Sequence, residues 1–198
     1  LSNFHSLHSA YYEDFYIPES ILLRGIVYLY ICQYEEMEKT LDLFDRIYKP
    51  VLSNLTNFLK AYSKPMTYYE EISSQQDNLE DLKKDTSGRR KYQIPFLVAR
   101  HIIKEGDYSR VRSYIDQIRN EWNEIDQTSD QWKKSELGQY SKKLLQGRMS
   151  SAKKVAGKYV RDHIVAIRKE LAELFEQHGF ARYEMLNGRK EQLKKKMA

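Results

Sequence analysis

Cysteine, glycine and proline are scarce in this sequence, and each scarcity excludes a class of structure. The single cysteine, Cys32, excludes an intrachain disulfide, and because it ends an apolar run we expect a small buried side chain. Only 8 glycines and 4 prolines in 198 residues leave few turn signals, which favours long helices. The longest apolar run, from Ile26 to Cys32, is far shorter than the about 18 residues that a membrane-spanning helix needs.

Motifs of catalysis and of metal or nucleotide binding are missing as well. The sequence contains no HExxH, CxxC, GxGxxG, GxxxxGK[ST] or GxSxG pattern. Adjacent acids such as Glu35 and Glu36 point about 100° apart on a helix, so they do not converge on one bond. We therefore predict that the protein is not an enzyme and that it holds no metal and no cofactor.

The chain is instead rich in helix-forming residues and tyrosine, and its charge is unevenly distributed. The 16 tyrosines suit half-buried helix faces and binding surfaces, because each combines an apolar ring with a polar tip. Residues 133–198 contain 17 Lys and Arg against 7 Asp and Glu, a net charge of +10, whereas residues 1–132 contain 16 against 21, a net charge of −5. The two parts should attract each other, within one molecule or between two.

Apolar residues recur at spacings of three and four through most of the chain, which predicts an all-α protein without β-sheet. Pro50 is expected to interrupt the second helix, and Gly179 the last. The predicted segments are amphipathic helices over 1–62, a polar linker or insertion over 63–91, a helix pair over 92–124, a loop with some helix over 125–143 and a long basic helix over 144–198.

Two of these segments repeat each other. When Tyr34 is laid over Tyr108, apolar or small residues coincide at every further position of the helical pattern. The small pair falls where two helices must approach closely. The matching pairs are Gly25 with Ala99, Tyr28 with Ile102, Met37 with Val111, Leu41 with Ile115, and Phe44 with Ile118.

This pattern resembles the tetratricopeptide repeat (TPR), a helix-turn-helix unit that stacks into an α-solenoid. Gly106, Asp107 and Tyr108 match the turn of that family, whereas Cys32 stands in place of the usual turn glycine. The resemblance implies TPR-like repeats followed by a long C-terminal helix. Residues 1–15 would be the second helix of a repeat whose first helix is missing.

In the TPR family, the first helices of the repeats line a groove that binds a segment of another protein. The resemblance therefore implies a protein-binding groove in this chain. Its first part is too apolar to stay exposed, so a partner segment or the chain's own C-terminal helix must cover it. The implied groove residues are Glu19, Leu22, Ile26, Leu29, Tyr30, Gln93, Phe96, Arg100 and Lys104.

A heptad pattern marks the C-terminal helix. Five apolar residues follow one another at spacings of 4, 3, 4 and 3, which is the seam of a coiled coil, and His178 and Gly179 are expected to end it. A lone helix with this seam is marginal in water. It must therefore pack on the chain's own repeats, or against a second copy or another protein's helix. The seam residues are Val160, Ile164, Ile167, Leu171 and Leu174.

These patterns predict a scaffold that binds a protein or peptide partner and catalyses no reaction. Two alternatives stay open: an assembly module that oligomerises through its C-terminal helix, and a helical nucleic-acid binder, although the basic tail lacks interleaved aromatics. Residues 15–20, 34–37 and 182–187 also resemble TPR scaffold proteins of Gram-negative gliding and predatory bacteria, which implies a periplasmic or a cytoplasmic site. Because the chain begins with Leu1 rather than Met, we expect a fragment of a longer protein.

Overall fold

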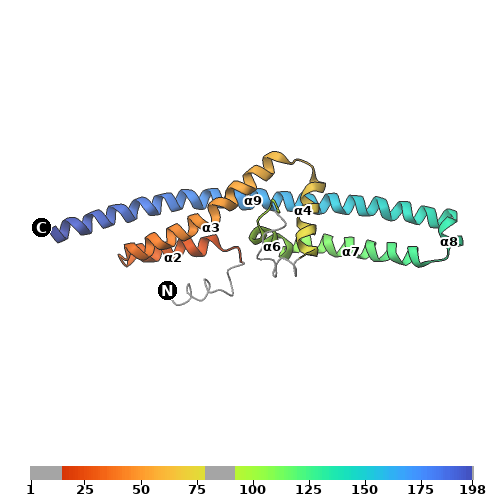
Figure 1. Cartoon of the computed structure of the whole chain (residues 1–198), viewed down its shortest axis with the longest axis horizontal. Coiled ribbons are helices and arrows are strands. Elements are labelled where there is room, and N and C mark those ends of the chain that lie inside the picture. The colour runs from red at the N-terminus through yellow and green to blue at the C-terminus, as the bar shows by residue number, and fades with distance from the viewer. Residues whose placement is uncertain (1–14, 79–91, 198) are drawn as a thin grey trace. The chain divides into compact units, whose positions relative to one another are not determined.

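In the computed structural model, residues 15–78 and 92–197 are described, and every regular element among them is an α-helix (Figure 1). This confirms the all-α prediction. The helix predicted over residues 1–15 lies, apart from Phe15, outside the described residues. The helices are α2 (Pro18–Tyr30), α3 (Tyr34–Ala61), α4 (Pro65–Asp77), α6 (Phe96–Lys104), α7 (Gly106–Gln127), α8 (Asp130–Lys134) and α9 (Glu136–Met197).

Helix α2 begins with Pro18, which suits a first turn because the missing N–H has no intrahelical partner there. It ends in a tight turn in which Cys32 has a φ of 56° and its N–H donates to the carbonyl of Leu29 at 3.0 Å. Cys32 is exposed, so the expectation of a buried side chain was wrong. The residue occupies a left-handed position that ends helices and favours glycine.

Helix α3 runs through Pro50 without interruption, contrary to the sequence prediction. A proline inside a helix leaves the carbonyl four residues earlier without its usual hydrogen bond. Pro50 and Arg46, the residue that carries this carbonyl, are both exposed. The lost hydrogen bond therefore faces water, which can replace it.

Helix α4 lies inside the stretch for which a polar linker is predicted. The apolar residues of its buried face are Tyr68, Tyr69 and Ile72, all at most 3% exposed, and Ser73 and Gln75 are buried beside them. Two of the three apolar residues are tyrosines, whose rings provide apolar area while their hydroxyls bind polar groups. The Tyr68 hydroxyl donates to the carbonyl of Tyr62 at 2.6 Å. A stretch poor in aliphatic residues can thus form a packed helix.

The chain divides into two compact units. Unit 1 comprises the described residues within Leu1–Phe58, Gln93–Val98 and Val165–Ala198, and unit 2 those within Leu59–Tyr92 and Ala99–Ile164. Helix α9 supplies residues to both units. None of the described helices combines the length and the apolar composition that crossing a membrane requires.

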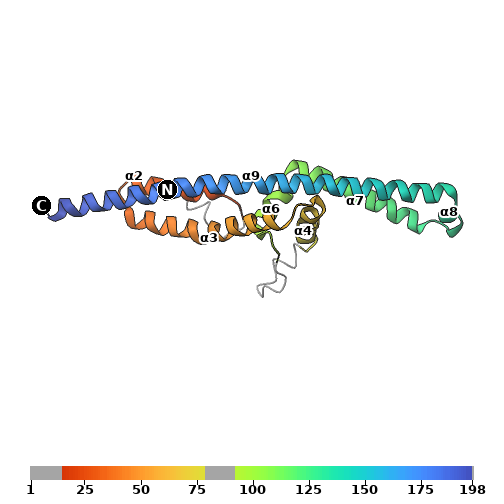
Figure 2. The same cartoon turned by 90° about the horizontal axis from the view of Figure 1, so that it is seen from above.

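In unit 1, the C-terminal part of α9 packs on α3, which crosses it at an angle in Figure 1 and lies along it in Figure 2. Phe175 and His178 of α9 lie against the ring of Phe44, with centroids 5.0 and 5.3 Å away. Helix α2 packs on the same helix, since an added Cβ at Gly25 would lie 3.5 Å from Leu41. Helices α2, α3 and α9 thus form a three-helix core.

In unit 2, α7 and the first part of α9 run antiparallel, joined by the short helix α8. Lys142 of α9 pairs with Asp126 of α7 at 2.6 Å and its ammonium lies 5.7 Å from the ring centroid of Trp122. Helix α4 packs on α9 so closely that a Cβ at Gly157 would collide with the backbone of Pro65. Only glycine permits this approach.

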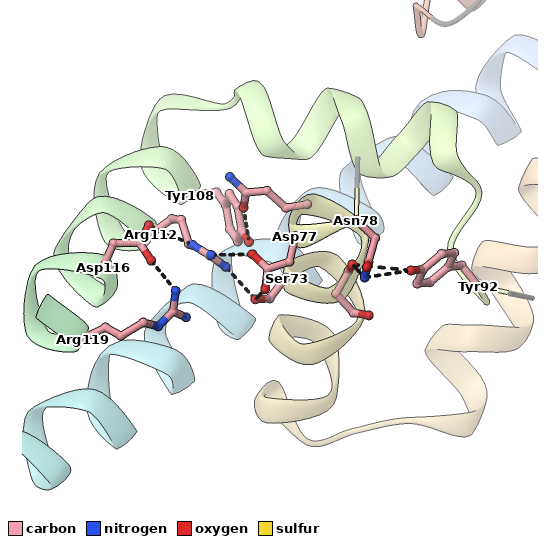
Figure 3. Close-up of polar contacts among 10 residues, drawn as sticks. Ser73, Asp77, Asn78, Tyr92, Tyr108, Arg112, Asp116 and Arg119 are labelled. Atoms are coloured by element: carbon pink, nitrogen blue, oxygen red, sulfur yellow. Dashed lines mark hydrogen bonds and ion pairs between the residues drawn. The ribbon is translucent and has the colours of Figure 1, made fainter. Parts of the chain in front are cut away.

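A buried arginine joins α4 to α7 within unit 2 (Figure 3). The Arg112 guanidinium donates to Ser73 at 2.6 Å, to Asp77 at 2.7 Å and to Asp116 at 3.1 Å. Although burial opposes its charge, the hydrogen bonds to Asp77 and Asp116 raise the pKa of Arg112 above its ordinary value. Next to it, burial raises the pKa of Tyr108 to about 12, so this hydroxyl stays protonated.

The heptad seam of α9 is buried along its whole predicted length, and every one of its five residues is at most 5% exposed. The seam does not end at His178, because the stripe continues through His178, Ala181 and Met185 at spacings of 4, 3 and 4. Nor does Gly179 break the helix, which also begins at Glu136, eight residues before the predicted start at 144. The His178 Nε2–H donates to the carbonyl of Leu41 at 3.1 Å. The buried imidazole N–H thus has a hydrogen-bond partner inside the core.

Candidate functional site

The first set of predicted groove residues lies entirely on α2, in unit 1. Glu19 and Tyr30 are exposed, Ile26 and Leu29 are half-buried, and Leu22 is buried with 2% of its surface exposed. Leu22 therefore belongs to the core between the helices, whereas Tyr30 is 83% exposed. The apolar stripe of α2 thus passes from the core to the surface along the helix.

At the C-terminal end of α2, the structure brings three of these residues together in a groove of about 460 Å³. Ile26, Leu29 and Tyr30 form one wall. The other wall comes from α9, where Phe180 is 66% exposed and Ala181 is buried at the base. We call this the α2–α9 groove. The chain's own C-terminal helix thus closes one side of the predicted groove and leaves the other side open.

The rim of the α2–α9 groove on the α9 side is acidic. Glu176 and Glu184 line it together with Gln177, and no cationic side chain does. Within the described part of the chain, neither glutamate takes part in an ion pair. Two unneutralised carboxylates beside an apolar floor attract a ligand that carries both apolar and cationic groups.

The α9 wall of the groove is fixed by polar contacts on its opposite side. Arg182 pairs with Asp42 at 2.7 Å and with Asp45 at 3.2 Å, and Arg189 pairs with Glu38 at 3.2 Å. Together with the buried hydrogen bond of His178, these contacts hold α9 against α3 above and below Phe180. They match the predicted attraction between the basic C-terminal part and the acidic N-terminal part.

The second set of predicted groove residues is divided between the two units. Gln93 is exposed and precedes α6, and Phe96 is the half-buried first residue of that helix; both belong to unit 1. Arg100 is half-buried and Lys104 exposed, and both belong to unit 2. The four residues therefore form no common surface within either unit.

The α9 side of the groove was not predicted from the sequence. Phe180 lies next to the heptad seam rather than on it, and the pairing of α2 with α9 joins residues far apart in the chain. An exposed aromatic residue directly beside a buried seam was the available signal. In the described parts of the chain, no three His, Cys, Asp or Glu side chains gather as metal ligands would.

Comparisons of the chain with protein-family models, with curated proteins and with solved structures gave no match.

Proposed function

We propose that this protein is a scaffold of TPR-like helix-turn-helix repeats that binds a segment of another protein in the α2–α9 groove and catalyses no reaction. The observation that carries this proposal is the pair of exposed aromatic side chains, Tyr30 and Phe180, on the two walls of an apolar groove. Exposed aromatic residues around an apolar depression are characteristic of protein-binding surfaces.

The helix pairs support the TPR-like part of the proposal. Residues 31–33 join α2 to α3, and Glu105 alone separates α6 from α7, which are turns as short as those of a helical hairpin. Gly25 and Ala99, the small residues aligned between the two pairs, are both buried. In the first pair, an added Cβ at Gly25 would lie 3.5 Å from Leu41 of α3, so the small residue allows a close approach of the two helices.

The chemistry of the groove defines the partner segment. Its floor takes aliphatic or aromatic side chains, and the carboxylates of Glu176 and Glu184 favour lysine or arginine beside them. We therefore infer a short segment with apolar residues flanked by positive charge. The charges set the orientation and the rate of association more than the affinity, which comes from the buried apolar side chains.

The test replaces the two aromatic residues, Tyr30→Ser with Phe180→Ser, and compares partner capture with the wild-type chain by quantitative mass spectrometry. Both side chains are exposed, so the variant should keep its circular dichroism spectrum and its melting temperature. We expect the specific partners to be lost. Leu23→Ser is the matched control, because Leu23 is 51% exposed on the same helix but does not line the groove. Equal capture by the aromatic variant and the control would contradict the proposal.

A second candidate function, assembly through the C-terminal helix, is favoured by a separate observation. Near the end of α9, Leu186, Leu193 and Met197 are exposed and line a shallow surface depression of about 400 Å³. Their spacings of 7 and 4 are those of a heptad pattern, displaced by one residue from the buried seam that passes through Met185. If this stripe pairs with another copy, Leu186→Lys with Leu193→Lys should convert a dimer to a monomer in sedimentation equilibrium. A wild-type chain that is monomeric throughout a wide concentration range would exclude self-assembly.

A further inference from the structure

A second and larger groove, of about 780 Å³, lies inside unit 2 between α7 and the first part of α9. We call it the α7–α9 groove. Helix α7 contributes Val111 and Tyr114, and α9 contributes the opposite wall, which runs from Tyr140 to Val155. At 1.5 Å of rise per residue, this wall is about 22 Å long. The groove is therefore an elongated depression whose length matches about four turns of a helix.

Helix α9 has two apolar faces along this groove. One is buried against the rest of unit 2 through Leu145 and Ala156. The second face, with Tyr140, Leu144 and Val155, is exposed. An apolar stripe at helical spacing that stays uncovered beside a second helix is the surface that an amphipathic helix uses in helix-in-groove recognition.

The middle of the groove is shaped for close approach. Gly147 lies there, and a Cβ added to it would meet no atom within 4 Å. The helix does not need glycine at this position for its own packing, and glycine costs about 0.5 to 1 kcal/mol of helix stability relative to alanine. With Ser151 one turn further along, it keeps the centre of the groove open to an incoming backbone.

The rim of the groove is basic. Lys143 and Arg148 line it, and no acidic residue does. Both side chains are exposed, and among the described residues neither forms an ion pair. A second copy docked symmetrically on this face would bring these cations against their own counterparts. The charges therefore select a partner other than this face of the same chain.

We propose that the α7–α9 groove binds an amphipathic helix of another protein, whose apolar stripe is flanked by aspartate and glutamate. The helix completes a three-helix arrangement with α7 and α9, covering Tyr114, Leu144 and Val155, while its acids pair with Lys143 and Arg148. This site is separate from the α2–α9 groove, whose rim is acidic. A scaffold with both grooves holds two segments of opposite charge.

The test uses a displayed library of helical peptides whose flanking positions vary among Glu, Lys and Gln, selected against the whole chain. Selected peptides are then measured by fluorescence anisotropy against wild type, Gly147→Trp and Gly179→Trp. Gly147→Trp fills the groove. Gly179→Trp is the matched control, because Gly179 lies in open space on the same helix but lines neither groove. The Tyr30→Ser, Phe180→Ser variant identifies peptides that bind to the α2–α9 groove instead.

We expect peptides whose affinity falls at least about tenfold on Gly147→Trp, corresponding to about 1.4 kcal/mol, and not on Gly179→Trp. These peptides should be rich in glutamate. The substitutions Lys143→Glu with Arg148→Glu should lower their affinity and raise the affinity of lysine-rich peptides. The proposal is overturned if no Gly147-dependent peptide is recovered, or if such peptides are basic. It is also overturned if Gly147→Trp instead dissociates a homodimer or releases the chain from phosphatidylserine vesicles. Loss of binding only in the Tyr30, Phe180 variant would leave the α2–α9 groove as the binding site and exclude this one.

Discussion

The two units differ in the polar contacts that join their helices. In unit 1, α9 is held by the buried hydrogen bond of His178 and by ion pairs near the surface, in which the side chain of Arg182 is 33% exposed and that of Arg189 43%. In unit 2, α9 contacts the backbone of Pro65 at Gly157 and pairs with α7 through Lys142 and Asp126. The network around Arg112, whose side chain is 9% exposed, joins α4 to α7 in the same unit. Exposed pairs contribute little each and are screened by salt. Unit 2 should therefore tolerate salt better and substitution worse than unit 1.

The largest expected effect is the loss of stability caused by a charged residue in the α9 seam, placed in one unit at a time. Leu171→Asp places a carboxylate in the core of unit 1 and Ile164→Asp does so in unit 2, at positions that are 0% exposed. Each change should cost roughly 4 kcal/mol or more, because an unpaired charge is buried. Hydrogen exchange should show protection lost first in the affected unit. If both variants kept the wild-type melting temperature, the seam would be exposed and α9 would pack on nothing.

Two glycines of α9 in unit 2 should respond to alanine substitution in opposite directions. Gly157→Ala forces a Cβ into the backbone of Pro65 and should destabilise the protein by roughly 1 to 3 kcal/mol. Gly147→Ala adds a Cβ where nothing lies within 4 Å and should stabilise it by about 0.5 to 1 kcal/mol. Urea denaturation of both variants measures the difference. A loss of stability in both would show that Gly147 is also packed, contrary to the open α7–α9 groove.

Substitution of one arginine in each unit compares the contribution of their ion pairs to stability. Arg112→Met leaves Ser73 and Asp77 without their partner and should cost about 2 kcal/mol, below the range for fully buried pairs because Asp77 is partly exposed. Arg182→Met should cost about 0.5 kcal/mol, and this loss should shrink in concentrated NaCl. Denaturation at low and high salt tests both values. A salt-independent cost for Arg182→Met would mean that packing, rather than charge, holds this part of α9.

The smallest expected effect concerns pH and lies in unit 1. Burial, together with the nearby carboxylates of Glu19 and Glu173, raises the pKa of Glu170 above its ordinary value of 4.5, although a hydrogen bond from Tyr16 partly opposes this. The folded state therefore binds this proton more tightly, and stability is lost as pH rises through that raised value. Glu170→Gln should match wild type at low pH and become the more stable protein as pH rises. A constant difference in melting temperature at every pH would contradict this assignment.

Much of unit 1 follows from the sequence, because its apolar residues are large, aliphatic and regularly spaced. The stripe of α2 and the seam of α9 were predicted on this basis, as was the need for something to cover α2. Helix α4 was not predicted, because its core contacts come from tyrosines in a stretch poor in aliphatic residues. The continuation of the seam past His178 was not predicted, because a histidine in the pattern was expected to end it. Its burial depends on the carbonyl of Leu41 in another helix, which the sequence does not show.

The two grooves were harder to predict from the sequence than the helices. Ile26, Leu29 and Tyr30 were predicted as groove residues from the TPR resemblance, but the opposite wall at Phe180 depends on tertiary pairing. The α7–α9 groove was missed for a related reason. Its residues on α9 form a second apolar stripe beside a buried one, and periodicity alone does not say which of two stripes a fold covers.

The ion pairs of α9 also bear on the order in which the chain folds. The contacts of Arg182 and Arg189 join residues 137 to 151 positions apart in the sequence, whereas those of Arg112 and Lys142 in unit 2 join residues at most 39 apart. Contacts between distant residues carry a larger loop-closure entropy and form more slowly. During synthesis, Phe44 must therefore wait for its contacts with Phe175 and His178 until more than half of α9 has left the ribosome. The α2–α9 groove is then among the last features of the molecule to exist, and a chain that stops before Phe175 never acquires it.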